Sequence, residues 1–370
     1  MNRMDSSSSV ELAWDLMKRY PSAEDYPYKS WSYPQGYLLM GISHLYERTG
    51  EKVYFDYIYE YCDRHVSGTG EVKGFTGCSM DDMMTGAVLV WMYEQTGEER
   101  FALACHRIYE SFGDYPRTRE GGFLHDRFRY PGEMWVDGVF MGQMFYCRYG
   151  KVFGKTECFR EAVRQLEVIY GYCHIHDGLL LHGYSEDSLA DWADQKGHSC
   201  SVWSEGLGWY ALILAQILEL MPADLRERKV PERFFRELLE GLKKYQDPES
   251  GLWFQVVDKP EDPRNWCDTS GSGMFLYAIT FGIEHGLADE AEFGPVIERA
   301  CEGLKTRIRS NTKNGHLDIV ECCNGLCVQR KEEDYYNYPK TVNAQEAVCS
   351  VLWGLEAVSR LQGRFDKEAS

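Results

Sequence analysis

Asp137 is an acid surrounded by apolar, aromatic and sulfur-containing residues. It is the only charged side chain within residues 134–141 (MWVDGVFM). Removal from water would raise the pKa of such a carboxyl group and let it hold a proton near neutral pH, as a general acid must. Alternatively, Asp137 opens the following helix and accepts backbone N–H groups, which would lower its pKa. The local sequence leaves both interpretations open.

Asp81 and Asp82 raise the same question. They follow Ser79 and precede the short apolar stretch 83–84 (MM). A Ser-x-Asp pattern commonly caps a helix, so capping is favoured more strongly here than at Asp137. If one of these acids lies near Asp137, repulsion between like charges would keep one proton on the pair. Two acids at helix starts on one rim would form a general acid/base site.

Aromatic residues and a histidine follow in the middle of the chain. His182 ends the short string 178–182 (GLLLH), and Trp192, Trp203 and Trp209 come within the next 27 residues. Tryptophans near acids on a concave surface are typical of carbohydrate sites, because the apolar face of a sugar stacks on an aromatic ring while its hydroxyls need polar partners. Each residue taken alone is more typical of a buried core. Together with the acids they favour a sugar-binding cavity.

Other kinds of chemistry find little support. The sequence has no phosphate-binding loop, dinucleotide fingerprint, nucleophile elbow or zinc-protease motif. Cys322, Cys323 and Cys327 form a tight cluster, but no second pair at zinc-ligand spacing follows. We therefore expect neither a metal nor a cofactor.

An internal repeat predicts the elements that position these residues. The segment 45–51 (LYERTGE) recurs as 92–98 (MYEQTGE), each preceded and followed by an apolar helical pattern. A glycine in each segment ends one helix and allows the next to begin, which is a repeating helical hairpin. Further hairpins are predicted at 206–245, 271–309 and 343–361, after a less regular one at 137–172.

Short strings beginning with glycine punctuate these hairpins. They lie at 122–125, 178–182, 251–255 and 315–318, and they are too short for helices. We expect extended connectors on one rim. About a dozen helices, or six hairpins, predict an all-α (α/α)6 barrel that forms one domain over residues 1–370. An open solenoid is the alternative; an irregular period and rim strings with Trp, His and Asp favour the closed ring.

Charge and cysteine content restrict the partners. The chain of 370 residues has 40 Lys and Arg against 58 Asp and Glu, a net charge of −18. That balance disfavours nucleic acid and anionic membrane surfaces. Thirteen cysteines without framework spacing, no apolar leader and no apolar run long enough to span a bilayer predict a cytoplasmic chain. The composition leaves monomer and homodimer open.

Several longer strings resemble glycoside hydrolase family 105, the unsaturated rhamnogalacturonyl hydrolases. They are residues 134–138 (MWVDG), 203–210 (WSEGLGWY), 251–258 (GLWFQVVD) and the stretch from Asn265-Trp266 to 270–275 (SGSGMF). Family 88, the unsaturated glucuronyl hydrolases, is a more distant likeness. The resemblance runs from residues 31–36 (WSYPQG) to the last hairpin, and it independently implies an (α/α)6 barrel.

The resemblance implies hydrolysis of a small unsaturated oligosaccharide made by a polysaccharide lyase. The residue matching Asp137 protonates C4 of a 4,5-unsaturated uronic acid (galacturonyl or glucuronyl) and then takes a proton from the water that adds at C5. The hemiketal opens and releases the shortened saccharide. Asp81 matches the second acid of the family. The residues expected to bind substrate are Tyr33, Trp135, His182, Trp203, Glu205 and Trp209.

Two positions depart from the family pattern. Glu205 stands where many members have arginine, which removes a favourable charge near an anionic sugar and adds a repulsive one. Tyr33-Pro34 also lacks a histidine found in some relatives. These departures leave the substrate open and keep two alternatives: a sugar-binding protein that has lost catalysis, and an N-acylglucosamine-type epimerase. The epimerase would need a histidine pair, for which His174 and His176 are the clearest candidates.

Overall fold

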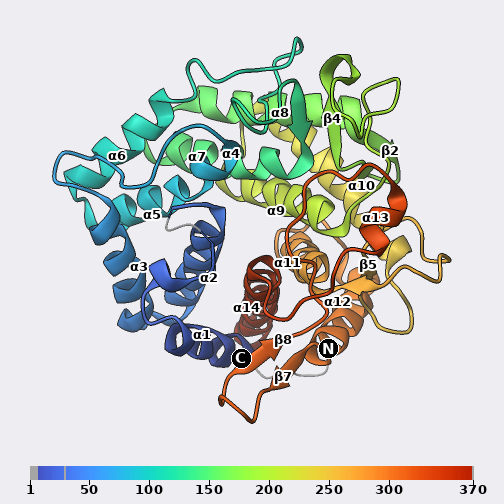
Figure 1. The fold of residues 1–370 in the computed structure, drawn as a ribbon. Helices are drawn as coiled ribbons and strands as arrows, with labels where there is room; N and C mark the ends of the chain where they lie inside the picture. The colour runs from blue at the N-terminus through green and yellow to red at the C-terminus, as the bar shows by residue number, and fades with distance from the viewer. Residues whose placement is uncertain (1–6, 29–30, 369–370) are drawn as a thin grey trace.

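The computed structural model describes residues 7–28 and 31–368. Its helices form two concentric rings around a common axis (Figure 1). The inner ring comprises α2 (Tyr33–Thr49), α4 (Met80–Met84) with α5 (Gly86–Thr96), α7 (Val136–Val152), α9 (Ser204–Leu220), α11 (Thr269–Glu284) and α14 (Gln345–Glu368). The outer ring comprises α1 (Ser7–Arg19), α3 (Lys52–His65), α6 (Glu99–Glu110), α8 (Thr156–Cys173), α10 (Lys229–Tyr245) and α12 (Glu290–Lys305).

The repeated segments end inner helices, as the sequence predicts. Gly50 and Gly97 follow α2 and α5 with φ of 70° and 69°. Each donates its backbone N–H to a carbonyl four residues earlier, at 2.8 Å, and so caps its helix. A residue with a Cβ atom disfavours this left-handed conformation, which explains the glycines. The next outer helix begins two residues later in both cases.

Burial separates the two rings. Sixteen of the seventeen residues of α9 are buried, because this inner helix has neighbours on both sides. The outer helix α10 buries a stripe that includes Phe234, Leu238 and Leu242 and exposes charged residues on its other face. Burying each such side chain contributes about 1.5–3 kcal/mol. No helix within the described parts of the chain combines the length and apolarity needed to span a membrane.

The ring closes differently from the sequence prediction at its last element. The hairpin predicted at 343–361 is wrong, because this segment is part of one helix, α14. Its outer partner is the N-terminal helix α1, where Ser9 donates to Glu356 at 2.8 Å. Arg48 of α2 also donates to the buried Glu356 carboxylate, at 2.5 Å. The first and last segments of the chain therefore close the ring, and the open solenoid is excluded.

Short antiparallel strands lie in four of the connections from an outer helix to the next inner helix, those that lead into α7, α9, α11 and α14. The predicted string 178–182 contains a strand, 251–255 contains another, and 315–318 overlaps a third, whereas 122–125 forms only an isolated bridge between Phe123 and Arg117. The paired strands are β1 (Glu133–Trp135) with β4 (Gly183–Ser185), β2 (His174–His176) with β3 (Leu179–Leu180), β5 (Trp253–Phe254) with β6 (Cys267–Asp268), and β7 (Ile308–Ser310) with β8 (Leu317–Ile319). A short helix α13 (Glu332–Tyr336) and 3-10 turns at Ala23–Asp25, Glu186–Ser188 and Arg226–Arg228 complete the described elements.

Candidate active site

The second residue of each inner helical segment marks the position of the site. These residues are Pro34, Asp81, Asp137, Glu205, Ser270 and Glu346, at the starts of α2, α4, α7, α9, α11 and α14. The four acids among them line one cavity of about 340 Å³. The inner helices therefore begin at a common rim and bring four carboxyl groups together there.

The cavity collects most of the residues predicted from the sequence. Seven of the eight predicted site residues line it: Tyr33, Asp81, Trp135, Asp137, Trp203, Glu205 and Trp209. The eighth, His182, is fully buried and lies outside the lining, with Nε2 3.8 Å from Asp137 Oδ1. Trp192 does not line the cavity; it packs beside Trp135 and donates to Glu133.

Asp137 has the environment of a carboxyl group that keeps its proton. The N-cap of α7 is Trp135, so Asp137 is the second helical residue and not the cap. Its side chain is 13% exposed. Burial raises the pKa of Asp137 to about 6; His125 opposes this rise, and the negative charge of Asp81 adds to it. About half of Asp137 at pH 6, and about a tenth at pH 7, therefore carries the proton that a general acid needs.

His125 lies between the two aspartates. Its Nδ1 is 3.8 Å from Asp137 Oδ2, and its Nε2 is 3.9 Å from Asp81 Oδ1. The ring stacks on Trp135 with centroids 4.1 Å apart. Burial lowers the pKa of His125, which favours a neutral imidazole. The sequence analysis did not select His125, although it ends the string 122–125 just as His182 ends 178–182.

His182 approaches Asp137 from the protein interior. Its Nδ1 is 2.8 Å from the Tyr335 hydroxyl, and its ring packs against Trp203. Burial holds the pKa of His182 well below its usual value. Within the described residues, His182 Nε2 and Asp137 Oδ1 have no hydrogen-bond partner. The 3.8 Å between them is too long for a hydrogen bond, so both atoms are buried without a partner among the described residues.

Glu205 belongs to a buried carboxyl cluster with Asp268 and Glu346. Ser270 Oγ lies 2.7 Å from Glu205 Oε2 and 2.6 Å from Asp268 Oδ2. Asp268 also accepts backbone N–H groups from Gly271 and Cys323, each at 2.8 Å, and so caps α11; these hydrogen bonds oppose the rise that burial causes in the pKa of Asp268. One serine hydroxyl has one proton to donate. If Ser270 donates to Asp268, the short contact with Glu205 requires a protonated Glu205.

The charges and burial around Glu205 also favour its protonated form. Burial, then the neighbouring Glu346 and Asp268, raise the pKa of Glu205 well above its usual value. Glu346 is itself buried and accepts a hydrogen bond from the Tyr33 hydroxyl at 2.5 Å. The repulsion expected from an ionised residue at 205 does not apply to the protonated form. Glu346 was not selected from the sequence.

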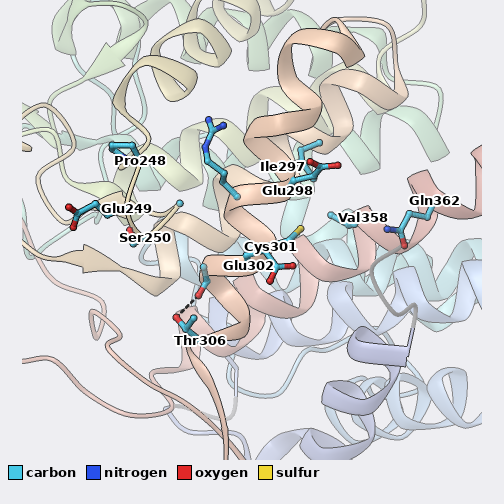
Figure 2. Close-up of a pocket in the computed structure, with 13 residues that line it drawn as sticks. Pro248, Glu249, Ser250, Ile297, Glu298, Cys301, Glu302, Thr306, Val358 and Gln362 are labelled. Carbon is cyan, nitrogen blue, oxygen red and sulfur yellow. Dashed lines mark hydrogen bonds between the residues drawn. The ribbon is translucent and has the colours of Figure 1, made fainter. Parts of the chain in front are cut away.

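A second cavity offers less for catalysis. A larger cavity of about 450 Å³ lies between the segment 248–251, α12 and α14 (Figure 2). Its lining contains Glu249, Glu298 and Glu302 but no aspartate or histidine. It therefore lacks the pairing of acids with imidazoles found in the smaller cavity.

The cysteine cluster and the pair of His174 and His176 are the alternative sites that the sequence suggests. Within the described residues, no group of three or more His, Cys, Asp or Glu side chains is arranged to hold a metal ion. Cys323 is buried, and burial raises the pKa of its thiol well above the usual value. His174 and His176 lie near Glu237 and Asp177, at 3.2 and 3.1 Å, and neither lines the cavity.

Comparison with known proteins relates the chain to carbohydrate-active families. The model of Glycosyl Hydrolase Family 88 matches residues 9–361. A glycoside hydrolase from family 105 of C. acetobutylicum has a similar structure, with a TM-score of 0.88 and 26% sequence identity over 95% of this chain and 99% of that chain.

Two curated relatives match parts of the chain. Protein Atu3128 of Agrobacterium fabrum is 34% identical over 148 residues, which are 40% of this chain and 63% of that protein. The unsaturated rhamnogalacturonyl hydrolase YesR of Bacillus subtilis is 24% identical over 257 residues, 68% of this chain and 70% of that protein.

Proposed function

The chain belongs to glycosyl hydrolase family 88, and from this we propose that it removes a 4,5-unsaturated uronic acid from the non-reducing end of an oligosaccharide. The substrate would be a galacturonyl or glucuronyl product of a polysaccharide lyase. The reaction would hydrate the C4=C5 double bond of the uronate rather than attack its anomeric carbon. The name of one relative, the unsaturated rhamnogalacturonyl hydrolase YesR, supports this reaction class, and the similar structure from glycoside hydrolase family 105 is consistent with it.

The observation that carries the proposal is the environment of Asp137. Hydration of a vinyl ether begins with proton transfer to carbon, so the enzyme needs an acid that is still protonated near neutral pH. Burial raises the pKa of Asp137 to about 6, and the side chain lines the cavity and is 13% exposed. A carboxyl group of this kind can hold its proton and aim it at a bound substrate.

The proposed steps use one carboxyl group twice. Asp137 donates its proton to C4, the C4=C5 double bond is lost, and the positive charge that develops at C5 is shared with the ring oxygen. Water adds at C5 and returns a proton to the Asp137 carboxylate. The hemiketal opens by breaking the bond between C5 and the ring oxygen: the C5 hydroxyl loses its proton to become a ketone, and the ring oxygen takes up a proton as a hydroxyl on C1. This C1 hemiacetal then breaks its bond to the saccharide oxygen, which takes the hydroxyl proton, and gives the free saccharide and a 4-deoxy-5-keto uronate with an aldehyde at C1. The balance is one substrate and one water giving two products.

Neighbouring residues support these steps in different ways. Asp81 keeps a negative charge near Asp137 and so favours its protonated form. Neutral His125 lies between the two acids, within 4 Å of each. Trp135, Trp203 and Trp209 line the same cavity and offer aromatic faces to a sugar ring.

The test is the ultraviolet absorbance of the conjugated double bond. Adding the enzyme to lyase-generated pectic or glycosaminoglycan oligosaccharides should lower this absorbance as the saccharide is released. Asp137→Asn should abolish the decrease while the protein keeps its helical circular dichroism. No decrease with any unsaturated uronide would refute the proposal, and an active Asn variant would remove Asp137 as the proton donor.

The same assay separates the enzyme from a sugar-binding protein on this fold. Binding of an unsaturated disaccharide, measured by calorimetry, without loss of the double bond would favour the binding protein. Binding with turnover supports the hydrolase.

A further inference from the structure

The cavity contains four acids and one basic residue. Asp81, Asp137, Glu205 and Glu346 line it, and Arg129 is the only lysine or arginine among the lining residues of the described chain. A uronate carries a carboxylate that needs a cationic or hydrogen-bonding partner when it leaves water. Glu205 and the other three acids cannot supply that positive charge.

Arg129 is held in place by a buried partner. Asp126 is 2% exposed and accepts the backbone N–H groups of Phe128 and Arg129, each at 2.8 Å. The guanidinium then contacts Asp126 Oδ2 through Nε at 2.8 Å and Nη2 at 2.7 Å. A guanidinium has five N–H groups, and these two contacts use two of them. The remaining N–H groups can form a second, two-pronged contact with a carboxylate.

Arg129 is held near Asp81 and His125, because its partner Asp126 directly follows His125 and forms a β-bridge with Ser79, two residues before Asp81. Burial lowers the pKa of His125, Asp137 and Asp126 oppose this, and Arg129 lowers it further. Asp126 is the charge that most raises the pKa of Arg129, and Asp81 raises it as well. Glu205 belongs to the opposite electrostatic group, because Glu346 and Asp268 are the charges that most raise its pKa. Arg129 thus lies beside Asp126 and near Asp81, and His125 is 3.8 Å from Asp137.

This arrangement matches the chemistry of an unsaturated uronate. The carboxylate carbon is bonded to C5, so it lies two bonds from C4, the atom that Asp137 would protonate. A carboxylate-binding group must therefore lie beside the proton donor, and His125, which is 3.8 Å from Asp137, directly precedes Asp126, the partner of Arg129. The guanidinium is 56% exposed, as a group at a cavity entrance is.

We propose that Arg129 binds the carboxylate of the unsaturated uronate. This inference rests on the proposed function for the identity of the ligand. It also orients the sugar, with the carboxylate toward Arg129 and ring hydroxyls toward Glu205 and Glu346.

The test compares acid and ester substrates. Pectin-derived unsaturated disaccharides exist as the free uronate and as its methyl ester, which has the same double bond but no carboxylate charge. Arg129→Gln should raise KM for the free uronate about 10- to 100-fold, because it removes charge-assisted hydrogen bonds to the carboxylate. The value of kcat should change less than about threefold. Wild-type enzyme should prefer the acid over the ester, and Arg129→Gln should lose that preference. Arg129→Lys keeps the positive charge but not the two-pronged hydrogen-bonding geometry of a guanidinium. Its KM for the free uronate should lie between those of the wild type and Arg129→Gln.

A matched control is available in the same connection between α6 and β1. Arg119 is 67% exposed and pairs with Asp187, and it does not line the cavity. Arg119→Gln removes an exposed, carboxylate-paired arginine and should leave KM and the acid preference unchanged. Thermal unfolding of all variants checks that each remains folded.

Binding separates this inference from the proposed function. In the Asp137→Asn background, adding Arg129→Gln should weaken calorimetric binding of the free uronate about 10- to 100-fold. Unchanged binding, or an Arg129→Gln enzyme that still prefers the acid, overturns the role of Arg129 even if the wild type is active. Absence of turnover by the wild type overturns the proposed function, while the binding comparison still decides the role of Arg129.

Discussion

Replacing Asp137 by asparagine should stabilise the protein, and the gain should depend on pH. Asparagine has nearly the same size but cannot ionise, so it removes the cost of ionising a buried carboxyl group. The folded wild type binds its Asp137 proton more tightly than the unfolded chain does. Wild-type stability is therefore fully present below the unfolded pKa and is lost as pH rises through the folded pKa.

The size of the stability difference follows from the pKa shift of Asp137. The pKa of Asp137 rises from 3.8 to about 6 on folding, because burial outweighs the opposing effect of His125 and Asp81 adds to the rise. At about 1.36 kcal/mol per pKa unit, the ionised wild type loses about 3 kcal/mol relative to the neutral variant by pH 7. For a chain of this length, with about 2 cal/mol/K of unfolding entropy per residue, this corresponds to about 4 °C in Tm.

The assay is thermal unfolding followed by circular dichroism between pH 4 and pH 8. The Tm of Asp137→Asn minus that of the wild type should grow by about 4 °C between pH 4 and pH 7 and then level off. Asp56→Asn is the matched control, because Asp56 is 53% exposed on α3 and neutralising it involves no buried carboxyl group. A difference for Asp137→Asn that is independent of pH, or that shrinks as pH rises, would refute the assignment of a raised pKa to Asp137.

Three further predictions concern activity. The value of kcat/KM should fall on the alkaline side with an apparent pKa of about 6 set by Asp137, and Asp81→Asn should move this fall to lower pH because it removes a charge that raises that pKa; an unmoved profile would contradict the coupling. Gly138→Ala places a Cβ atom 2.9 Å from His125 Nδ1, so kcat should fall at least about tenfold with little change in circular dichroism, whereas full activity would show that the His125 position is not needed. Glu205→Gln should keep kcat/KM at pH 7 within about threefold, since a protonated acid and an amide are both neutral donors; a loss above about thirtyfold would indicate that the ionised form of Glu205 is required.

Local patterns in the sequence predicted much of the ring and of the site. The repeated segments 45–51 and 92–98 combine helical periodicity with a capping glycine, and both signals are confined to a few residues. Asp137 was identified because its neighbours in sequence are also its neighbours in space, at the start of a buried helix. Such features are readable without knowledge of the tertiary structure.

Other features depend on contacts between distant parts of the chain. Glu346 resembles any acid in the first turn of a helix, and only ring closure brings it to Tyr33, which is 313 positions away. The pairing of α1 with α14 likewise joins the two ends of the chain, which explains why the segment 343–361 was mistaken for a hairpin. The protonated state of Glu205 follows from Ser270 and Asp268, more than 60 positions later, and no local pattern around Glu205 reports it.

The identity of the protonated atom is the central claim, and proton NMR of the reaction in deuterium oxide tests it most directly. If Asp137 protonates C4, the vinyl C4–H resonance of the unsaturated uronide should disappear at the same rate as the reducing end of the released saccharide appears, with deuterium incorporated at C4. Asp137→Asn should leave both signals unchanged. Release of the saccharide while the vinyl resonance persists would mean attack at the anomeric carbon and would contradict the account.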